Sequence, residues 1–361
     1  MADEPEGSPS RKGPLPLRAE VDEAAARHVS ESQEAPRGFV GKLKVFLELV
    51  KFEHSIFALP YAYIGAIYAA LWFSSGPDVI KGRALLLVPA SRLGIPGSFL
   101  VPWHWITGSG WPTIMAIVWI TVAMVGARSF AFAVNRAVDK EIDARNPRTA
   151  GRAVPSGLIK AWELWAFAAV VLAAFLYAVW QLHPIVRWLW PLVLAAFVIY
   201  PYTKRFTALC HYWLGLCLGL APIGAWVGIT GRLSDWAPWL FGGAVMIWTA
   251  GFDMIYATQD IECDVRDHIH SMPADHGIAP ALLQTKITHA LTVVLFVLAG
   301  LTASAGWPYY VGIALAAALL VYENAIVSPT DLSRVNAAFF TFNGVIAVII
   351  FLGSLADRLL R

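Results

Sequence analysis

The chain has 361 residues, of which 58% are hydrophobic and only 14% charged. Soluble domains usually carry about 25% charged residues, so this composition excludes a soluble globule. The net charge of +2 gives no reason to expect a nucleic-acid partner. Apolar runs of about 20 residues, long enough to cross a bilayer as helices, indicate an all-α polytopic membrane protein.

The predicted elements begin with a polar segment, residues 1–40, which we expect to be a disordered cytosolic tail. Residues 41–361 then form one membrane domain, opened by an amphipathic stretch at 41–53 that suits the membrane interface. We predict about nine spans, near residues 54–74, 112–134, 161–181, 186–202, 211–230, 237–257, 286–304, 308–327 and 336–355. The long connection 75–111 is interrupted by Pro and Gly, which favours a re-entrant or interfacial piece over a further span.

Lysine and arginine in the connections predict the orientation, because loops on the cytoplasmic side carry an excess of these residues. They occur before the first span and after the second and fourth spans, at Lys42, Lys44, Lys51, Arg136, Lys140, Arg145, Arg148, Arg152, Lys160, Lys204 and Arg205. These connections share one side of the membrane. We therefore expect a multi-pass protein of the inner cell membrane, with the N-terminus and these loops in the cytoplasm.

Two acidic motifs occur at the ends of the second and sixth predicted spans. Asn135, Asp139 and Asp143 recur at every fourth residue, so on a helix they share one face. A second set at similar spacing contains Asp253, Tyr256, Asp260 and Asp264. The sets are related by a single offset, since 256 − 135, 260 − 139 and 264 − 143 all equal 121. Internal repeats in membrane proteins often place a site at the interface between the two halves.

Carboxylates clustered in this way repel one another and require a compensating cation. Aspartate and asparagine oxygens are hard ligands that suit Mg²⁺, which typically takes one or two carboxylates together with substrate phosphate. The two motifs therefore predict two metal sites that face a shared diphosphate. The alternative is that each motif belongs to an ion-paired cytoplasmic loop. Matching motifs at matching ends of two repeats argue against that alternative.

Basic residues surround the predicted metal sites. Arg148, Arg152, Lys204 and Arg205 follow the second and fourth spans, where they are candidate diphosphate ligands. Arg128 differs, because it lies within a span on the same helical face as Asn135 and about 10 Å deeper. A charged residue inside a membrane usually faces a polar cavity. We expect Arg128 to bind an acceptor carboxylate or the inner part of the diphosphate, the alternative being a structural ion pair.

At these residues the chain resembles a known family. NRAVDKEID and DMIYATQDIECD resemble the two aspartate motifs of the UbiA superfamily of membrane prenyltransferases. RTAGRAVPSG and YPYTKR resemble basic segments of its quinone-biosynthesis members, and LVKFEHSIFALPYAY resembles its 4-hydroxybenzoate polyprenyltransferase-like branch. The resemblance extends from about residue 41 to the C-terminus. It departs from the family at the longer connection 75–111.

The resemblance implies nine helices around a central cavity with a cytoplasmic cap. It also implies two Mg²⁺ ions that bridge an isoprenyl diphosphate. Matched residue by residue, it assigns Asn135, Asp139 and Asp143 to one metal and Asp260 and Asp264 to the other. Asp253 and Tyr256 then flank the reaction cavity as candidate catalytic residues, with Asp253 as a candidate base.

The predicted function is transfer of a polyprenyl group from its diphosphate to a small aromatic acid such as 4-hydroxybenzoate. The expected partners are the diphosphate, the aromatic acid and the lipid bilayer. The motifs leave open a 1,4-dihydroxy-6-naphthoate prenyltransferase of the futalosine route and, more distantly, haem O or chlorophyll synthase. From other classes, a membrane cation transporter would need acids near the middle of a span. A CDP-alcohol phosphotransferase would need a DGxxAR motif.

Overall fold

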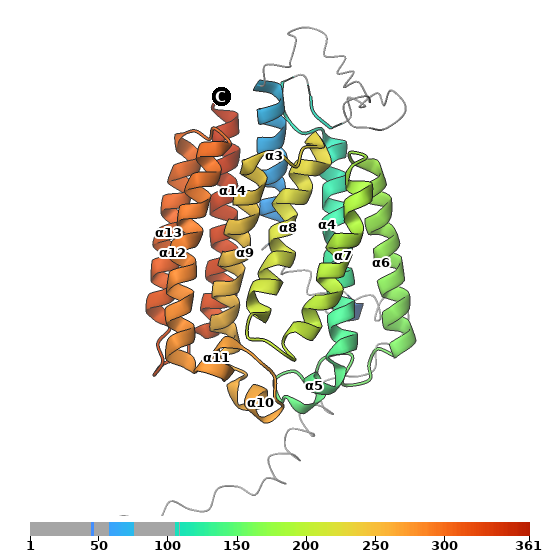
Figure 1. Ribbon diagram of the computed structural model, residues 1–361, viewed down its shortest axis with the longest axis vertical. Helices are drawn as coiled ribbons and strands as arrows, with labels where there is room; N and C mark the ends of the chain where they lie inside the picture. The colour runs from blue at the N-terminus through green and yellow to red at the C-terminus, as the bar shows by residue number, and fades with distance from the viewer. Residues whose placement is uncertain (1–44, 47–57, 76–104, 108) are drawn as a thin grey trace, which may run out of the picture.

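The computed structural model describes residues 45–46, 58–75, 105–107 and 109–361. The predicted tail at 1–40 and most of the amphipathic stretch and of the connection 75–111 lie outside these residues. Within them the protein is almost wholly helical, as predicted (Figure 1). The long helices are α3 Leu59–Ser75, α4 Ile114–Val138, α6 Ala161–Gln181, α7 Val186–Thr203, α8 Cys210–Thr230, α9 Trp236–Ala257, α12 Ile278–Thr302, α13 Trp307–Ile326 and α14 Asn343–Leu359.

Eight of the described helices are long and apolar enough to cross a membrane, counting α14 together with the π-helix η3, Ala337–Phe342, that leads into it. The shorter apolar helix α3 corresponds to the first predicted span. The largest difference from the predicted boundaries is at α12, which begins at Ile278 and not at 286. Pro280 falls in the first turn of α12, where a missing N–H costs no hydrogen bond, so the helix starts before its continuously apolar part.

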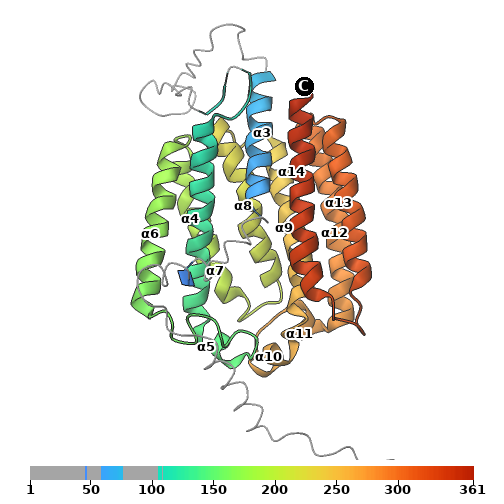
Figure 2. The same cartoon turned by 180° about the vertical axis from the view of Figure 1, so that it is seen from behind.

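The helices form two groups on either side of α3 and α8 (Figures 1 and 2). One group contains α4, α6 and α7, and the other contains α9, α12, α13 and α14. Three short helices, α5 Lys140–Arg145, α10 Ile261–Arg266 and α11 Met272–His276, lie at the end of the bundle opposite the C-terminus. Both acidic motifs therefore come to the same end of the molecule.

The helix termini follow the capping chemistry of the sequence. Thr113 begins α4, and its side chain accepts a hydrogen bond from the backbone N–H of Ala116 at 3.1 Å. Gly231 ends α8 in the left-handed conformation at φ 69°, which glycine adopts without steric cost. Pro308 lies in the first turn of α13, where its fixed φ suits a helix start.

Helices α8 and α9 approach each other very closely. A Cβ added at Gly215 would lie 2.0 Å from the carbonyl oxygen of Met246, and one at Gly219 would lie 2.4 Å from that of Gly242. Small residues permit this backbone contact, as in other membrane helix pairs. The pair brings the start of α8 beside the end of α9, at the end of the bundle that carries the acidic motifs.

The internal repeat is visible in the structure. Helix α5 covers residues 140–145 and α10 covers 261–266, and adding 121 to the first range gives the second. Each is preceded by an aspartate at the junction with a long helix. Asp139 has φ −94° and ψ 5°, and Asp260 has φ −108° and ψ 2°. The two halves of the chain thus present their acidic motifs in the same local conformation.

Candidate active site

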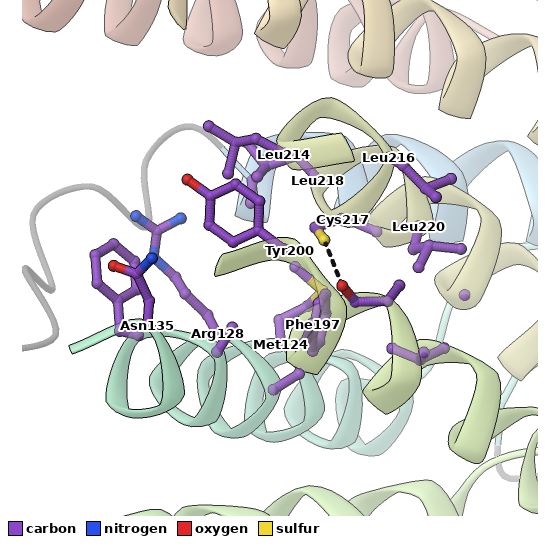
Figure 3. Close-up of a pocket in the computed structure, with 18 of the residues that line it drawn as sticks. Met124, Arg128, Asn135, Phe197, Tyr200, Leu214, Leu216, Cys217, Leu218 and Leu220 are labelled. Carbon is purple, nitrogen blue, oxygen red and sulfur yellow. Dashed lines mark hydrogen bonds between the residues drawn. The ribbon is translucent and has the colours of Figure 1, made fainter. Parts of the chain in front are cut away.

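A cavity of about 680 Å³ opens among α4, α6, α7, α8 and α9. Its walls are polar at the end formed by α5 and α10 and apolar over the rest of its length, where side chains of α6, α7 and α8 line it. Figure 3 shows Arg128 and Asn135 of α4 and Tyr200 of α7 at one side, with leucines 214, 216, 218 and 220 of α8 further along. The cavity suits a ligand with a charged head and an apolar tail.

The first acidic motif keeps its common face although α4 ends at Val138. The backbone N–H of Asp139 donates to the carbonyl of Asn135 at 2.9 Å, and that of Asp143 donates to the carbonyl of Asp139 at 2.7 Å. These bonds between residues four apart carry the helical periodicity across the junction with α5. In consequence Asn135, Asp139 and Asp143 all line the cavity, as their spacing predicts.

Each buried aspartate of this motif is bound by basic side chains from elsewhere. Asp139 accepts a hydrogen bond from the Lys204 ammonium at 2.6 Å and from the Asn135 amide at 3.0 Å. Asp143 is bound on one oxygen by Arg152 at 2.7 Å and on the other by Arg136 at 3.2 Å. Since both aspartates are buried, these pairings compensate charge that water cannot reach.

The second motif lies on the opposite wall of the polar end. The Asp260 carboxylate is bound in a fork by Arg148 and accepts a further hydrogen bond from the Asn146 amide at 2.8 Å. Arg148 also donates to the Tyr256 hydroxyl at 2.8 Å. The ring of Tyr256 stacks on Phe339 of η3, with centroids 4.1 Å apart. A chain of contacts therefore runs from Asp260 through Arg148 of the loop after α5 and Tyr256 of α9 to Phe339 of η3.

Asp264 has no basic partner within hydrogen-bonding distance among the described residues. It accepts one hydrogen bond, from the Ser271 hydroxyl at 2.9 Å. Burial raises the pKa of Asp264 to about 6, because the charged carboxylate is deprived of water. A cation in the cavity would favour its ionised form. The carboxylate of Asp264 is thus available to a cation in the cavity.

Comparison with known proteins identifies this arrangement. Residues 96–345 match the model of the UbiA prenyltransferase family. The chain belongs to that family. Proteins named 4-hydroxybenzoate octaprenyltransferase from Marinobacter nauticus and Pseudomonas aeruginosa are similar to it. The first is 31% identical, covering 72% of this chain and 90% of the relative, and the second is 30% identical, covering 77% and 95%.

Solved structures of the family share the fold. A UbiA homolog from Aeropyrum pernix K1 superposes with a TM-score of 0.68 at 30% identity, covering 84% of this chain and 98% of that one. A UbiA homolog from Archaeoglobus fulgidus bound to GPP and Mg²⁺ superposes with a TM-score of 0.56 at 17% identity, covering 87% and 99%. The predictions of family, fold class and prenyltransferase activity are confirmed, and the protein is an integral membrane enzyme.

The structure of this UbiA-family protein brings nearly all predicted site residues to one cavity. Arg128, Asn135, Asp139, Asp143, Arg148, Arg152, Lys204, Asp253, Tyr256, Asp260 and Asp264 line it. Arg205 differs, since it is not among the residues that line the described cavity. Its guanidinium donates to the carbonyl of Val138 at 3.0 Å and lies 3.5 Å from Asp139. These contacts tie Arg205 to the end of α4.

Several residues of the site carried no clear signal in the sequence. Arg136 lies seven residues before Asp143, two helical turns away, and this spacing indicates that they share a face. Asn146 and Tyr200 also line the cavity. His211 contacts Asp253 from the first turn of α8. Because each of these last three lies on a different element from its partners, no periodicity in the sequence links them.

The donor set fits Mg²⁺ of the kind that shares its coordination with a substrate. Among the residues that the structure describes, no three carboxylate, histidine or cysteine side chains converge as a closed metal cage. Mg²⁺ seldom uses such a cage, and usually takes one or two carboxylates plus phosphate oxygens and water. The aspartates of the two motifs offer those hard oxygens on facing walls of the cavity.

Proposed function

We propose that the protein transfers a polyprenyl group from polyprenyl diphosphate to a small aromatic acid of the 4-hydroxybenzoate type, in quinone biosynthesis. The observation that carries the proposal is the division of a single cavity into a charged end and an apolar length. The diphosphate belongs at the charged end and the prenyl chain along the apolar walls. The names of the relatives and the GPP and Mg²⁺ bound to a structural neighbour support the same assignment.

Asn135, Asp139 and Asp143 are the proposed ligands of one Mg²⁺, with Asp260 and Asp264 as ligands of a second. When bound, the metal supplies positive charge that stabilises the departing diphosphate. Arg148, Arg152 and Lys204 are bound to these aspartates in the structure, and their donors can turn to phosphate oxygens. Arg205 does not line the described cavity, and its proposed part is to hold the end of α4 and Asp139 in place beside the diphosphate.

Arg128 is the proposed ligand of the acceptor carboxylate. It lines the cavity below the aspartates, and its Nε is buried without a hydrogen-bond partner in the described part of the chain. Its guanidinium also lies 5.0 Å from the ring centroid of Phe132. A carboxylate would satisfy the guanidinium donors and fix the orientation of an aromatic ring.

Asp253 is the proposed proton acceptor. It lies one turn before Tyr256 on the cavity wall, between the charged end and the apolar walls. The apolar walls exclude water that would otherwise capture the allylic cation. The ring attacks this cation at carbon, and Asp253 then takes the ring proton. Tyr256, held between Arg148 and Phe339, forms a flat aromatic wall at the same depth.

The direct test is a transfer assay with the purified full-length protein, a labelled polyprenyl diphosphate and a panel of acceptors. The panel contains 4-hydroxybenzoate, 1,4-dihydroxy-6-naphthoate and, as a control without a carboxylate, 4-hydroxybenzamide. We expect prenylated 4-hydroxybenzoate, no product after chelation with EDTA, and recovery on addition of Mg²⁺. Undiminished transfer in excess chelator contradicts the metal sites, and transfer to the naphthoate alone reassigns the acceptor.

A further inference from the structure

His211, in the first turn of α8, makes a contact that the proposed roles above do not use. Its side chain is only 3% exposed, and its Nδ1 lies 2.7 Å from Oδ2 of Asp253. Asp253 is 22% exposed and lines the cavity. Among the described residues, no other group is hydrogen-bonded to this carboxylate. The Oδ1 atom of Asp253 is therefore left for the contents of the cavity.

The backbone fixes which nitrogen of His211 carries the proton. The N–H of Met272 donates a hydrogen bond to Nε2 of His211 at 3.1 Å. A ring nitrogen that accepts a hydrogen bond carries no proton, so in the neutral imidazole the proton lies on Nδ1. His211 consequently donates to Asp253. It holds one carboxylate oxygen and cannot take a proton from the other.

The segment that supplies this N–H is itself anchored to the charged end of the site. Three consecutive residues make the connections. The His270 N–H donates to the carbonyl of Lys204 at 2.7 Å, and the Ser271 hydroxyl donates to Asp264 at 2.9 Å. Met272 then binds His211. The same short segment thus contacts the side chain of a proposed metal ligand, the backbone of a proposed diphosphate ligand and the histidine that holds Asp253.

We propose that His211 is a positioning residue, which aims Oδ1 of Asp253 at the ring proton of the acceptor. The inference rests on the proposed aromatic prenyl transfer. In that reaction the allylic C–O bond breaks and its electron pair leaves with the diphosphate. A ring carbon then forms the new C–C bond, and the C–H bond at that carbon breaks. Its electrons restore the aromatic ring and its proton passes to Oδ1 of Asp253, while His211 stays neutral.

Two substitutions separate the two hydrogen bonds of His211. In His211→Asn the amide nitrogen can occupy the place of Nδ1 and still donate to Asp253, whereas the bond from Met272 is lost. In His211→Gln the longer amide can accept from Met272, whereas the donor beside Asp253 is lost. We expect kcat of His211→Gln to fall about tenfold or more, which is less than the full effect of losing a general base, and that of His211→Asn to stay within about threefold of wild type. The KM for the diphosphate should not change in either.

A deuterium effect identifies the step that slows. With 4-hydroxybenzoate deuterated at the ring positions beside the hydroxyl, proton removal by a misplaced Asp253 becomes rate-limiting. We expect the isotope effect on kcat to be larger in His211→Gln than in wild type and His211→Asn. In an Asp253→Asn background, His211→Gln should cause no further loss, because a residue that acts through Asp253 has nothing left to position.

A third variant leaves His211 intact. Met272→Pro removes the N–H that binds Nε2, at the first position of α11, where proline suits a helix start. Without that N–H the tautomer of His211 is no longer fixed, so we expect a loss of kcat and a rise in isotope effect that are both smaller than in His211→Gln. An unchanged isotope effect in His211→Gln, or an additional loss in the Asp253→Asn background, overturns the role of His211. Absence of any transfer by the wild type overturns the proposed function instead. Thermal unfolding in detergent checks that each variant is folded.

Discussion

At the scale of single residues, Asp139 and Glu141 lie two positions apart but in different surroundings. Asp139 is buried and faces the cavity, whereas Glu141 is exposed on α5. In the second half of the chain, Asp260 is half-buried and lines the cavity, whereas Glu262 is exposed on α10. We expect Asp139→Ala and Asp260→Ala each to lower transfer at least about 100-fold, because metal charge is worth several kcal/mol in such reactions.

Glu141→Ala and Glu262→Ala are the matched controls, with activity expected within about threefold of wild type, since neither lines the cavity. The measurement is the initial rate of prenyl transfer per folded enzyme, with folding checked by gel filtration and thermal unfolding. Equal losses in all four variants would contradict the argument that helical faces separate these acids.

Arg128 lies deeper than the aspartates, and the proposed carboxylate ligand can be tested by kinetics. Arg128→Lys keeps a positive charge but loses the planar fork that binds a carboxylate through two hydrogen bonds. We expect the apparent KM for the aromatic acid to rise about tenfold, the effect of losing about 1.4 kcal/mol, with little change in the KM for the diphosphate. Direct binding of each substrate should accompany these values, because KM is only a proxy for affinity.

The reverse pattern would place the inner diphosphate at Arg128. Wild-type kinetics for both substrates in a folded Arg128→Lys protein would leave this residue a structural role. Its contact with Phe132 is then the interaction to examine.

The sequence predicted which residues form the site better than it predicted the contacts between them. Spacing of four identified both acidic motifs. Backbone bonds between residues four apart continue through Asp139 and link Asp264 to Asp260, whereas the N–H of Asp260 donates to the carbonyl of Ala257, three residues back. Arg205 was expected beside the diphosphate, and its observed contacts are with the carbonyls of Pro201 and Val138, which the sequence did not predict. The bond between His211 and Asp253 was not predicted, since 42 residues separate them and only packing of α8 on α9 joins them.

At the scale of elements, the close contact of α8 with α9 holds two cavity walls in place. Gly219→Ala puts a methyl group against the backbone oxygen of Gly242, which cannot move without shifting α9. We expect this change to destabilise the folded protein by about 1–3 kcal/mol, as overpacking usually does. The measurement is unfolding of the full-length protein in detergent.

Gly224 supplies the control on the same helix. A Cβ at Gly224 meets nothing within 4 Å, so Gly224→Ala should be neutral or slightly stabilising, because alanine favours a helix. Similar destabilisation by both substitutions would contradict the special role of the close contact with α9.

Element boundaries show where patterns of apolar residues stop being informative. Helix α12 begins eight residues before its predicted start, since Pro280, Gln284 and Thr285 interrupt the apolar run there. The π-helix η3 was not predicted either. Its sequence, AAFFTF, is apolar and suits an ordinary helix, and η3 packs against α9 and α13.

At the scale of the whole molecule, the charged end of the cavity and the basic connections lie at the same end of the bundle. We expect this end to face the cytoplasm, because positively charged loops are retained there. Ser156 is exposed in the loop before α6, and Ser234 is exposed in the α8–α9 loop at the opposite end. In a variant without the three native cysteines, Ser234→Cys should react with a membrane-impermeant maleimide added outside spheroplasts. Ser156→Cys should react only after permeabilisation.

Labelling of Ser156→Cys in sealed spheroplasts would reverse the orientation. Activity of the cysteine-free protein is the control for its folding. Labelling of both cysteine variants in sealed spheroplasts would indicate that the protein inserts in two orientations.

The π-helix before α14 has a consequence for the ancestry of the chain. A π-turn contains one residue more than an α-turn, and it leaves backbone carbonyls that the next turn does not use. The side chain of Asn343 donates to two of them, Ala338 at 2.9 Å and Phe339 at 3.3 Å, and to Glu323 of α13 at 2.9 Å. An inserted residue at this point supplies carbonyls that the side chain of Asn343 binds. Either feature without the other would therefore leave hydrogen-bonding groups unpaired. In related genes we expect the two to have been gained, and lost, as a pair.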